Sequence, residues 1–290
     1  MLFNKINICI IGSGKLGLSF VDFFNKNNCN FKLICRSESS FKNALKFVNQ
    51  SHILRNISEI DTIPNMFILA VKDDEIKTTS NILAEKFKYL LDQKYCIHCS
   101  GMLSSNELIA CKEYGAIALS LHPYQTFFYS KAENFKDIHW GIEGDINSQV
   151  IDFIKFMGGV PHKIDTTKKI IYHISAVAMS NYLNTAIALG KLTSQKAGIS
   201  PEEFAPEIIK TTVSNILNPN DIDNYTLTGP IARGDVNTVV SHITALKQED
   251  NLLKPYCYLG LGTLELSKSA NLINEEIYNN LKIIFEENLK

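Results

Sequence analysis

The 290-residue chain carries 29 Lys and Arg against 30 Asp and Glu, a net charge of −1, and 45% of its residues are hydrophobic. This length predicts two domains with a sizeable core. The balanced charge argues against a nucleic-acid or membrane-surface protein, because no basic excess exists to neutralise phosphates. No apolar run reaches the roughly 18 residues of a membrane span. We therefore expect partners that are neither nucleic acid nor membrane.

The seven cysteines and the N-terminal residues indicate the cellular compartment in which the protein is expected. An odd number of thiols in apolar runs is typical of reduced cysteines, and the chain enters its first strand without a signal-peptide pattern. These features predict a cytoplasmic protein. Cys96 and Cys99 share a C-x-x-C spacing, but such residues on a strand point to opposite faces, and no second pair completes a zinc site. We expect no metal.

The first half of the chain alternates short apolar runs with helical patterns, which predicts a mainly parallel sheet built from βαβ units. The clearest helix is Asp74–Leu91, and Asp74 is the expected cap at its start, with Asp73 as the alternative. The predicted strands are Ile6–Ile11, Phe31–Cys35, Met66–Val71, Tyr95–His98, Ala116–Leu121, His139–Ile142 and Pro161–Ile164.

After Asp165 the pattern becomes entirely helical. Thr166–Leu192 carries apolar residues on all sides, so we expect a long helix that is buried on most sides. The fold class is thus α/β, with a Rossmann-type domain at 1–165 and an all-helical domain at 166–290. Apolar helices such as Leu252–Leu266 predict a homodimer formed through the second domain. Further helices are predicted at Ser200–Asn218, Asp235–Lys247, Leu252–Lys268 and Asn274–Asn288.

A glycine-rich turn follows the first strand and opens a helix. Gly12 permits the tight turn, Gly14 lets a pyrophosphate approach the backbone, and Gly17 lets the helix pack closely on the strand. The helix N-terminus offers free N–H groups to the phosphates. The predicted dinucleotide-binding residues of this turn are Gly12, Ser13, Gly14, Lys15, Leu16 and Gly17.

The end of the second strand indicates which dinucleotide binds. NAD sites usually place a carboxylate there, whereas this strand ends with Arg36 and Ser37, which suit a 2′-phosphate. We therefore expect NADP(H). Two alternatives stay open. Glu38 could bind the ribose of NAD, and Arg36 could be a solvated residue at the end of the strand with no role in cofactor binding. Val71 and Lys72 leave the third strand at the edge where the cofactor binds.

Five short motifs carry a resemblance to a known family of Rossmann-like proteins with a characteristic helical C-terminal domain of formerly unknown function. They are Ile97–Gly101, Ser120–Phe127, Tyr172–Ala176, Ser180–Leu183 and, as the most specific, Leu227–Asp235. That family resembles pyrroline-5-carboxylate reductases and β-hydroxyacid dehydrogenases, and some members are an alternative class of ketopantoate reductase. The resemblance implies NADPH, hydride transfer to a carbonyl and a helical domain that often dimerises.

Candidate catalytic residues lie on the first long helix of the second domain. His173 has a reference pKa suited to proton donation, and Lys169 lies one turn earlier on the same face, as an alternative donor. Asn181 lies eight residues after His173 and is expected on that face as well. The spacing departs from the Lys-x-x-x-Asn pattern of related enzymes, and a histidine between helices with no catalytic role is the alternative for His173.

Candidate substrate-binding residues lie in loops. Arg233 follows a Gly/Pro turn and presents a planar fork suited to a carboxylate, unless it pairs with Asp235, the expected cap of the next helix. His122 ends a strand at the ligand edge, where it lines the pocket or ties down the loop, and Ser100 leaves the neighbouring strand there. His242 is a weaker candidate.

These features predict an NADPH-dependent 2-oxo acid reductase, with 2-dehydropantoate as the preferred substrate. The alternatives are an imine reductase, another hydroxyacid oxidoreductase, or a non-catalytic NADPH-binding regulator.

Overall fold

The computed structural model describes residues 3–131, 135–218 and 226–290. The chain forms two compact units, Met1–Ala178 and Met179–Lys290. The division lies thirteen residues beyond the boundary expected at 165/166, because the first turns of the long helical segment pack on the sheet. No helix among the described residues is long and apolar enough to cross a bilayer.

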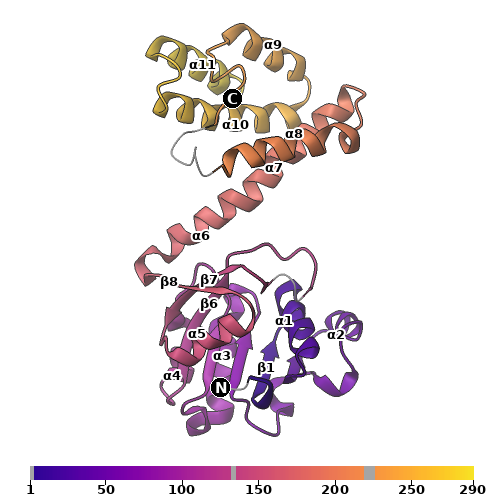
Figure 1. Ribbon diagram of the computed structural model, residues 1–290, viewed down its shortest axis with the longest axis vertical. Helices are drawn as coiled ribbons and strands as arrows, with labels where there is room; N and C mark the ends of the chain where they lie inside the picture. Colours follow the sequence, from indigo (N-terminus) through magenta and orange to yellow (C-terminus); the bar gives the residue numbers. More distant parts are fainter. Residues whose placement is uncertain (1–2, 132–134, 219–225) are drawn as a thin grey trace. The chain divides into compact units, whose positions relative to one another are not determined.

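The first unit contains an eight-stranded sheet with the strand order β3-β2-β1-β4-β5-β6-β7-β8. Every neighbouring pair is parallel except β6 and β7, which are antiparallel. The α/β fold with a mainly parallel sheet is therefore confirmed (Figure 1). The strands are β1 (Asn7–Ile11), β2 (Asn30–Ile34), β3 (Ile53–Leu54), β4 (Met66–Leu69), β5 (Tyr95–His98), β6 (Ile117–Pro123), β7 (His139–Gly144) and β8 (Val160–Lys163).

Helices cover both faces of this sheet. In β1, Ile8 and Ile10 enter one apolar core while Cys9 and Ile11 enter the other, as expected of a strand buried on both sides. The first core holds α1 and α5, and the second holds α3 and α4. The helices are α1 (Lys15–Lys26), α2 (Glu38–Ala44), α3 (Asp73–Phe87), α4 (Ile109–Lys112), α5 (Ser148–Phe156) and α6 (Lys169–Val177).

Short 3-10 turns connect these elements. They are η1 (Phe3–Lys5), η2 (Gln50–His52), η3 (Ile57–Glu59), η4 (Lys88–Leu91), η5 (Ser105–Leu108) and η7 (Thr166–Lys168).

The cysteines Cys96 and Cys99 lie in different cores, on opposite faces of the sheet, as the strand geometry predicts. All seven cysteines are buried free thiols. Because β1 lies between β2 and β4, the strand order reverses beside β1, and the carboxyl ends of these strands form the crevice where α/β sheets bind ligands.

The second unit is helical, as predicted. Its core comes from the turn at Ile231 and from α9, α10 and α11. Asp235 caps α9 by accepting a hydrogen bond from the Thr238 N–H, which confirms the predicted cap. The elements are the π-helix η8 (Ala178–Tyr182), which crosses the boundary between the units, and α7 (Leu183–Lys196), α8 (Pro201–Ile216), α9 (Val236–Leu246), α10 (Asp250–Ser269) and α11 (Glu275–Glu287).

The burial of two helical segments differs from expectation. The long helical segment is not buried on most sides, because Ile171 and Met179 are each 68% exposed in the single chain. The segment is also interrupted by the π-helix. Helix α10 buries one apolar face within its own unit, including Leu253 and Leu264, because α9 and α11 pack against it, while Tyr258 and Leu266 stay exposed.

Candidate functional site

The glycine-rich turn after β1 has the geometry of a phosphate cradle. Gly12 has φ +109°, and a Cβ there would lie 2.3 Å from the Ala70 carbonyl oxygen. A Cβ on Gly17 would lie 2.0 Å from the Gly12 carbonyl oxygen, so this residue sets the close packing of α1 on the strand. A Cβ on Gly14 would meet nothing within 4 Å, which leaves open space beside the backbone. The three glycines thus have the separate roles that a dinucleotide site requires.

The start of α1 faces the same open space. Gly14 is the N-cap without a side-chain hydrogen bond, and the helix begins at Lys15. The first N–H groups of a helix have no intrahelical partner, so they can bind an anion. Leu16 packs on the first core, Ser13 is half-buried, and Lys15 is exposed. These residues fit a bound pyrophosphate.

Arg36 lies just beyond β2 and already has a partner. Its Nη2 lies 2.5 Å from Oε1 of Glu75, in the first turns of α3. Ser37 caps α2 by accepting from the Ser40 N–H and donates its own hydrogen to the Ser40 hydroxyl. Glu38 pairs with Arg55 at 3.2 Å. A cofactor phosphate at Arg36 would therefore meet the Glu75 carboxylate as well as the guanidinium.

The turn after β4 differs from expectation. Helix α3 begins at Asp73 and its N-cap is Lys72, so neither Asp73 nor Asp74 is the cap. Asp73 instead accepts a hydrogen bond from the Ser100 hydroxyl at 2.8 Å, and this contact holds it at the strand end. The expected cofactor residue Val71 lies beside Gly12, where its Cγ1 would be 3.2 Å from a Cβ on that glycine.

Ser100 organises the turn after β5. Its hydroxyl donates to Asp73 and accepts from the N–H groups of Met102 and Leu103. Its own N–H donates to Nδ1 of His98, whose Nε2 lies 3.0 Å from the Ser104 carbonyl oxygen. A carbonyl only accepts, so His98 carries its proton on Nε2. Burial lowers the His98 pKa to about 4, so this ring is neutral and structural.

Lys169, at the start of α6, is 2% exposed and reaches this turn. Its Nζ donates to the carbonyl oxygen of Ser100 at 2.9 Å, and also to the Leu103 carbonyl and the Ser120 hydroxyl. An ammonium group has three donors, so all of them are used. Burial lowers the Lys169 pKa to about 8, and this effect is opposed by the nearby carboxylates of Glu143 and Asp73.

Glu143 on β7 was not predicted from the sequence. It is 6% exposed and accepts from the Ser105 N–H at 2.6 Å, the Ser105 hydroxyl at 2.9 Å and the Thr166 hydroxyl at 3.1 Å. The sequence did contain a signal for it, because Glu143 follows the apolar strand residues and a carboxylate is seldom buried without hydrogen-bond partners. Glu143 ties the end of β7 to the segments before α4 and α6.

Two histidines meet at Gly101. A Cβ on this glycine would lie 2.4 Å from Nδ1 of His173 and 2.8 Å from Nε2 of His122. The ring centroids are 5.6 Å apart, edge to face. Nδ1 of His173 is buried and has no hydrogen-bond partner among the described residues. The His122 pKa is lowered to about 4, mainly by burial and also by His173 and Lys169. The structure thus brings together His122, His173, Lys169 and Ser100.

The remaining predicted residues lie in the second unit. Asn181 is exposed, accepts a hydrogen bond from the Ser180 hydroxyl, and lies in the π-helix. The wider π turn alters the eight-residue spacing on which its expected alignment with His173 depended. Arg233 is exposed and makes no side-chain hydrogen bond or ion pair within the described chain. The Asp235 pKa is lowered mainly by its hydrogen bonds from Thr238, with a smaller contribution from the Arg233 charge. His242 bonds the Tyr256 hydroxyl at 2.9 Å.

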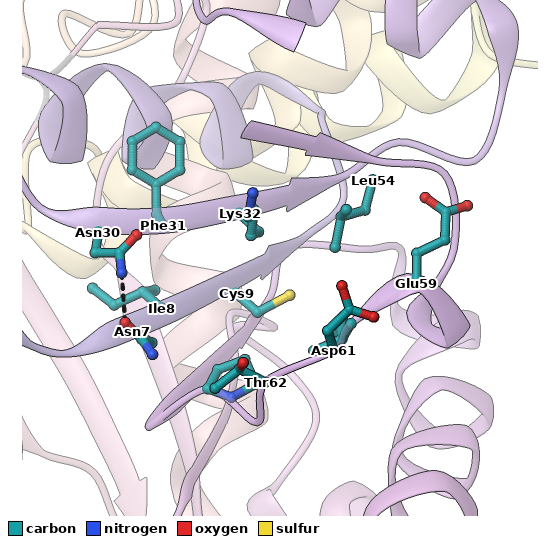
Figure 2. Close-up of a pocket in the computed structure, with 12 residues that line it drawn as sticks. Asn7, Ile8, Cys9, Asn30, Phe31, Lys32, Leu54, Glu59, Asp61 and Thr62 are labelled. Carbon is teal, nitrogen blue, oxygen red and sulfur yellow. Dashed lines mark hydrogen bonds between the residues drawn. The ribbon is translucent and has the colours of Figure 1, made fainter. Parts of the chain in front are cut away.

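A separate cavity of about 280 Å³ lies at the amino ends of β1 and β2. Figure 2 shows Asn7 and Asn30 hydrogen-bonded at one side and Glu59 and Asp61 on the loop at the other. This cavity is at the opposite end of β1 from Gly12, so it is not the cofactor crevice.

Comparisons with known proteins bear on the family and the fold. The model of a domain of unknown function, DUF2520, matches residues 138–263. No curated protein matches the sequence. Among solved structures, a Bacteroides fragilis protein described as an NADP oxidoreductase has a TM-score of 0.69 at 19% identity, over 92% of this chain and 98% of that one.

Two other similar structures are named enzymes. A reductive aminase from Aspergillus terreus in complex with NADPH and ethyl-5-oxohexanoate has a TM-score of 0.58 at 12% identity, covering 97% of this chain and 93% of that one. A pyrroline-5-carboxylate reductase from Coxiella burnetii has a TM-score of 0.57 at 14% identity, covering 99% and 100%. At these identities the likeness concerns the fold, which is the Rossmann-type sheet followed by helices that the sequence predicts.

Proposed function

We propose that this chain is an NADP(H)-dependent oxidoreductase that reduces a C=O or C=N bond of a small carboxylate-bearing molecule, with 2-dehydropantoate as the first substrate to test. The observation that carries the proposal is the placement of two elements at the carboxyl edge of one sheet. They are the glycine cradle after β1 and the cluster of Lys169, His122 and His173 around the turn after β5. The solved neighbours that carry NADPH or are named NADP oxidoreductases support the same cofactor.

The cofactor would be held by the backbone of Gly12–Gly17 at its pyrophosphate and by Arg36 at its 2′-phosphate. When bound, it supplies the hydride. The chain itself must then provide a proton donor for the developing negative charge and an anchor for the substrate.

His173 is the stronger candidate for the proton donor. Lys169 uses all three of its N–H groups on the turn after β5 and on Ser120 of β6, so it can protonate a substrate only by breaking this arrangement. His173 is held one helical turn later on α6, and its ring abuts Gly101 at the sheet edge. Arg233 is the proposed carboxylate anchor, and its exposed guanidinium leaves the fork available for a planar anion.

The test is a screen of NADPH oxidation against 2-oxo acids, with 2-dehydropantoate included, and against cyclic imines. Turnover of a 2-oxo acid supports the first assignment, whereas imine turnover alone supports the second candidate, which the reductive aminase and pyrroline-5-carboxylate reductase folds favour. NADPH binding without turnover of any compound would instead favour a non-catalytic regulator.

We further propose that the protein is a homodimer whose interface includes the exposed apolar residues of α6, η8 and α7. Ile170, Ile171 and Ile174 on α6 and Met179 and Tyr182 on η8 are all more than half exposed. Large apolar side chains exposed in successive turns of a helical segment are typical of an interface between subunits. We expect a dimeric mass by light scattering at micromolar concentration and a monomeric mass for Ile171→Glu. Tyr89→Glu, at an exposed site on the first unit, is the matched control and should remain dimeric.

A further inference from the structure

Tyr172 and His122 form a pair that the proposed function does not use. The Tyr172 hydroxyl lies 3.0 Å from Nδ1 of His122, and the two rings are perpendicular with centroids 5.5 Å apart. The hydroxyl occupies the space left by Gly141, where a Cβ would lie 2.7 Å from it. Gly141 on β7 is the register partner of His122 on β6. The sheet register and α6 together therefore hold this contact in place.

Both members of the pair are neutral near pH 7. Burial raises the pKa of Tyr172 well above its ordinary value, with a further contribution from Tyr124. The His122 pKa of about 4 reflects burial first, with smaller contributions from His173 and Lys169 on α6. A neutral imidazole has one N–H donor and one acceptor nitrogen, so the tautomer decides which nitrogen donates.

The hydrogen bond between Tyr172 and His122 decides this tautomer. A neutral phenol has a single O–H proton to donate, and the Tyr172 oxygen lies 3.0 Å from Nδ1 of His122. The phenol proton then needs an acceptor, and Nδ1 of His122 is the one within hydrogen-bond distance among the described residues. If Nδ1 carried the proton instead, the half-buried phenol would lose this acceptor, which costs a hydrogen bond.

We propose that Tyr172 is a positioning residue that holds His122 with its proton on Nε2, so that His122 is a fixed hydrogen-bond donor beside His173 at the Gly101 turn. Nε2 is the nitrogen that faces Gly101. A fixed N–H at this edge stabilises the negative charge that develops on a carbonyl oxygen or imine nitrogen, whereas the opposite tautomer presents a lone pair to it. The catalytic meaning of this donor rests on the proposed function, but the tautomer does not.

The tautomer can be measured without any substrate. Full-length protein labelled with ¹⁵N is examined by long-range ¹H–¹⁵N correlation near pH 7, and the His122 signals are identified from their loss in His122→Gln. We expect a single Nε2–H tautomer in the parent and a mixed or reversed one in Tyr172→Phe. Tyr124→Phe is the matched control, since that hydroxyl contacts Ser175 and should leave the His122 signals unchanged. A parent protein with the proton on Nδ1 overturns the proposal, even if the variant does not fold.

Kinetics then test the consequence. With a substrate found by the NADPH screen, Tyr172→Phe should lower kcat by roughly three- to tenfold, the loss expected for one hydrogen bond, and leave the Kd for NADPH unchanged. An unchanged tautomer together with an unchanged kcat in Tyr172→Phe refutes the positioning role. If the parent turns over no compound in the screen, the proposed function fails, while the nitrogen spectrum still decides the tautomer.

Discussion

Arg36 forms an ion pair with Glu75, and this pair bears on the predicted preference for NADPH over NADH. We expect Arg36→Ala to weaken NADPH binding by roughly ten- to a hundredfold, because charge-assisted hydrogen bonds contribute about 1.5–3 kcal/mol, and to leave NADH nearly unaffected. Glu75→Gln should tighten NADPH binding, because it removes the carboxylate that lies 2.5 Å from the guanidinium and would repel a 2′-phosphate. Fluorescence titration with both cofactors measures this. Equal losses for NADPH and NADH in Arg36→Ala would contradict a 2′-phosphate contact.

At Arg233 and His173, the proposed roles predict different kinetic losses. Arg233→Ala should leave folding and NADPH binding intact and lower kcat/KM by roughly 30-fold or more, since losing one partner of a desolvated charge pair costs about 2–5 kcal/mol. Arg233→Lys should recover only part of the lost kcat/KM, because lysine lacks the planar guanidinium group that pairs with a carboxylate through two hydrogen bonds. His173→Ala should lower kcat more than it raises KM. An Arg233→Ala enzyme with parental kcat/KM would place the anchor elsewhere.

Among the elements, the turn after β5 controls the histidine pair. Gly101→Ala would place a Cβ 2.4 Å from His173 Nδ1 and 2.8 Å from His122 Nε2, so at least one ring must move. We expect a loss of about 1–3 kcal/mol in stability from overpacking and a larger proportional loss in kcat. Gly190→Ala on α7 is the matched control, since a Cβ there meets nothing within 4 Å and alanine favours a helix. A Gly101→Ala enzyme with parental kcat would show that this pair is not part of the site.

For the whole molecule, the buried titratable groups set the pH dependence of stability. The folded-state pKa values of His98 and His122 are about 4, below the unfolded value of about 6.5. The unfolded chain thus binds more protons between these values, so the stability contributed by these two neutral histidines is full above pH 6.5 and falls as the pH drops towards 4. The Lys169 pKa is lowered to about 8 in the folded protein, so the unfolded chain binds more protons between about pH 8 and 10.5. The contribution of Lys169 to stability therefore also rises with pH in that range.

The test follows the urea unfolding of the first unit by the fluorescence of Trp140, the single tryptophan of the chain. We expect the parent to lose stability between pH 6.5 and 4.5 more steeply than His98→Gln, because protonating the buried His98 costs on the order of 3 kcal/mol at full extent. Carboxylates contribute equally to both curves, so the difference reports on this imidazole. Parallel curves for the two proteins would show that His98 is not buried as a neutral ring.

Local patterns were sufficient for much of this molecule. The apolar runs predicted the strands to within one or two residues at most ends, because a strand buried on both faces needs uninterrupted apolar sequence. Gly12 and Gly17 were assigned from spacing, since the constraints on each are set by residues close in sequence or in the adjoining strand. The Asp235 cap followed from a hydrogen bond that spans three residues. Features of this kind depend on the backbone and its nearest neighbours, so they can be predicted from the sequence.

Long-range pairing required the tertiary structure. The partners of Arg36, His122 and Lys169 lie 39, 50 and 69 residues away, and no periodicity links such positions. They meet because parallel strands align their carboxyl ends at one edge, and the register of β6 against β7 places Gly141 beside His122. Burial of a helix also depends on what packs against it, which is why Ile171 of α6 is exposed while Leu264 of α10 is buried. The sequence alone determined the fold class and the cofactor loop, whereas the sheet register and helix packing decided which side chains meet in the candidate site.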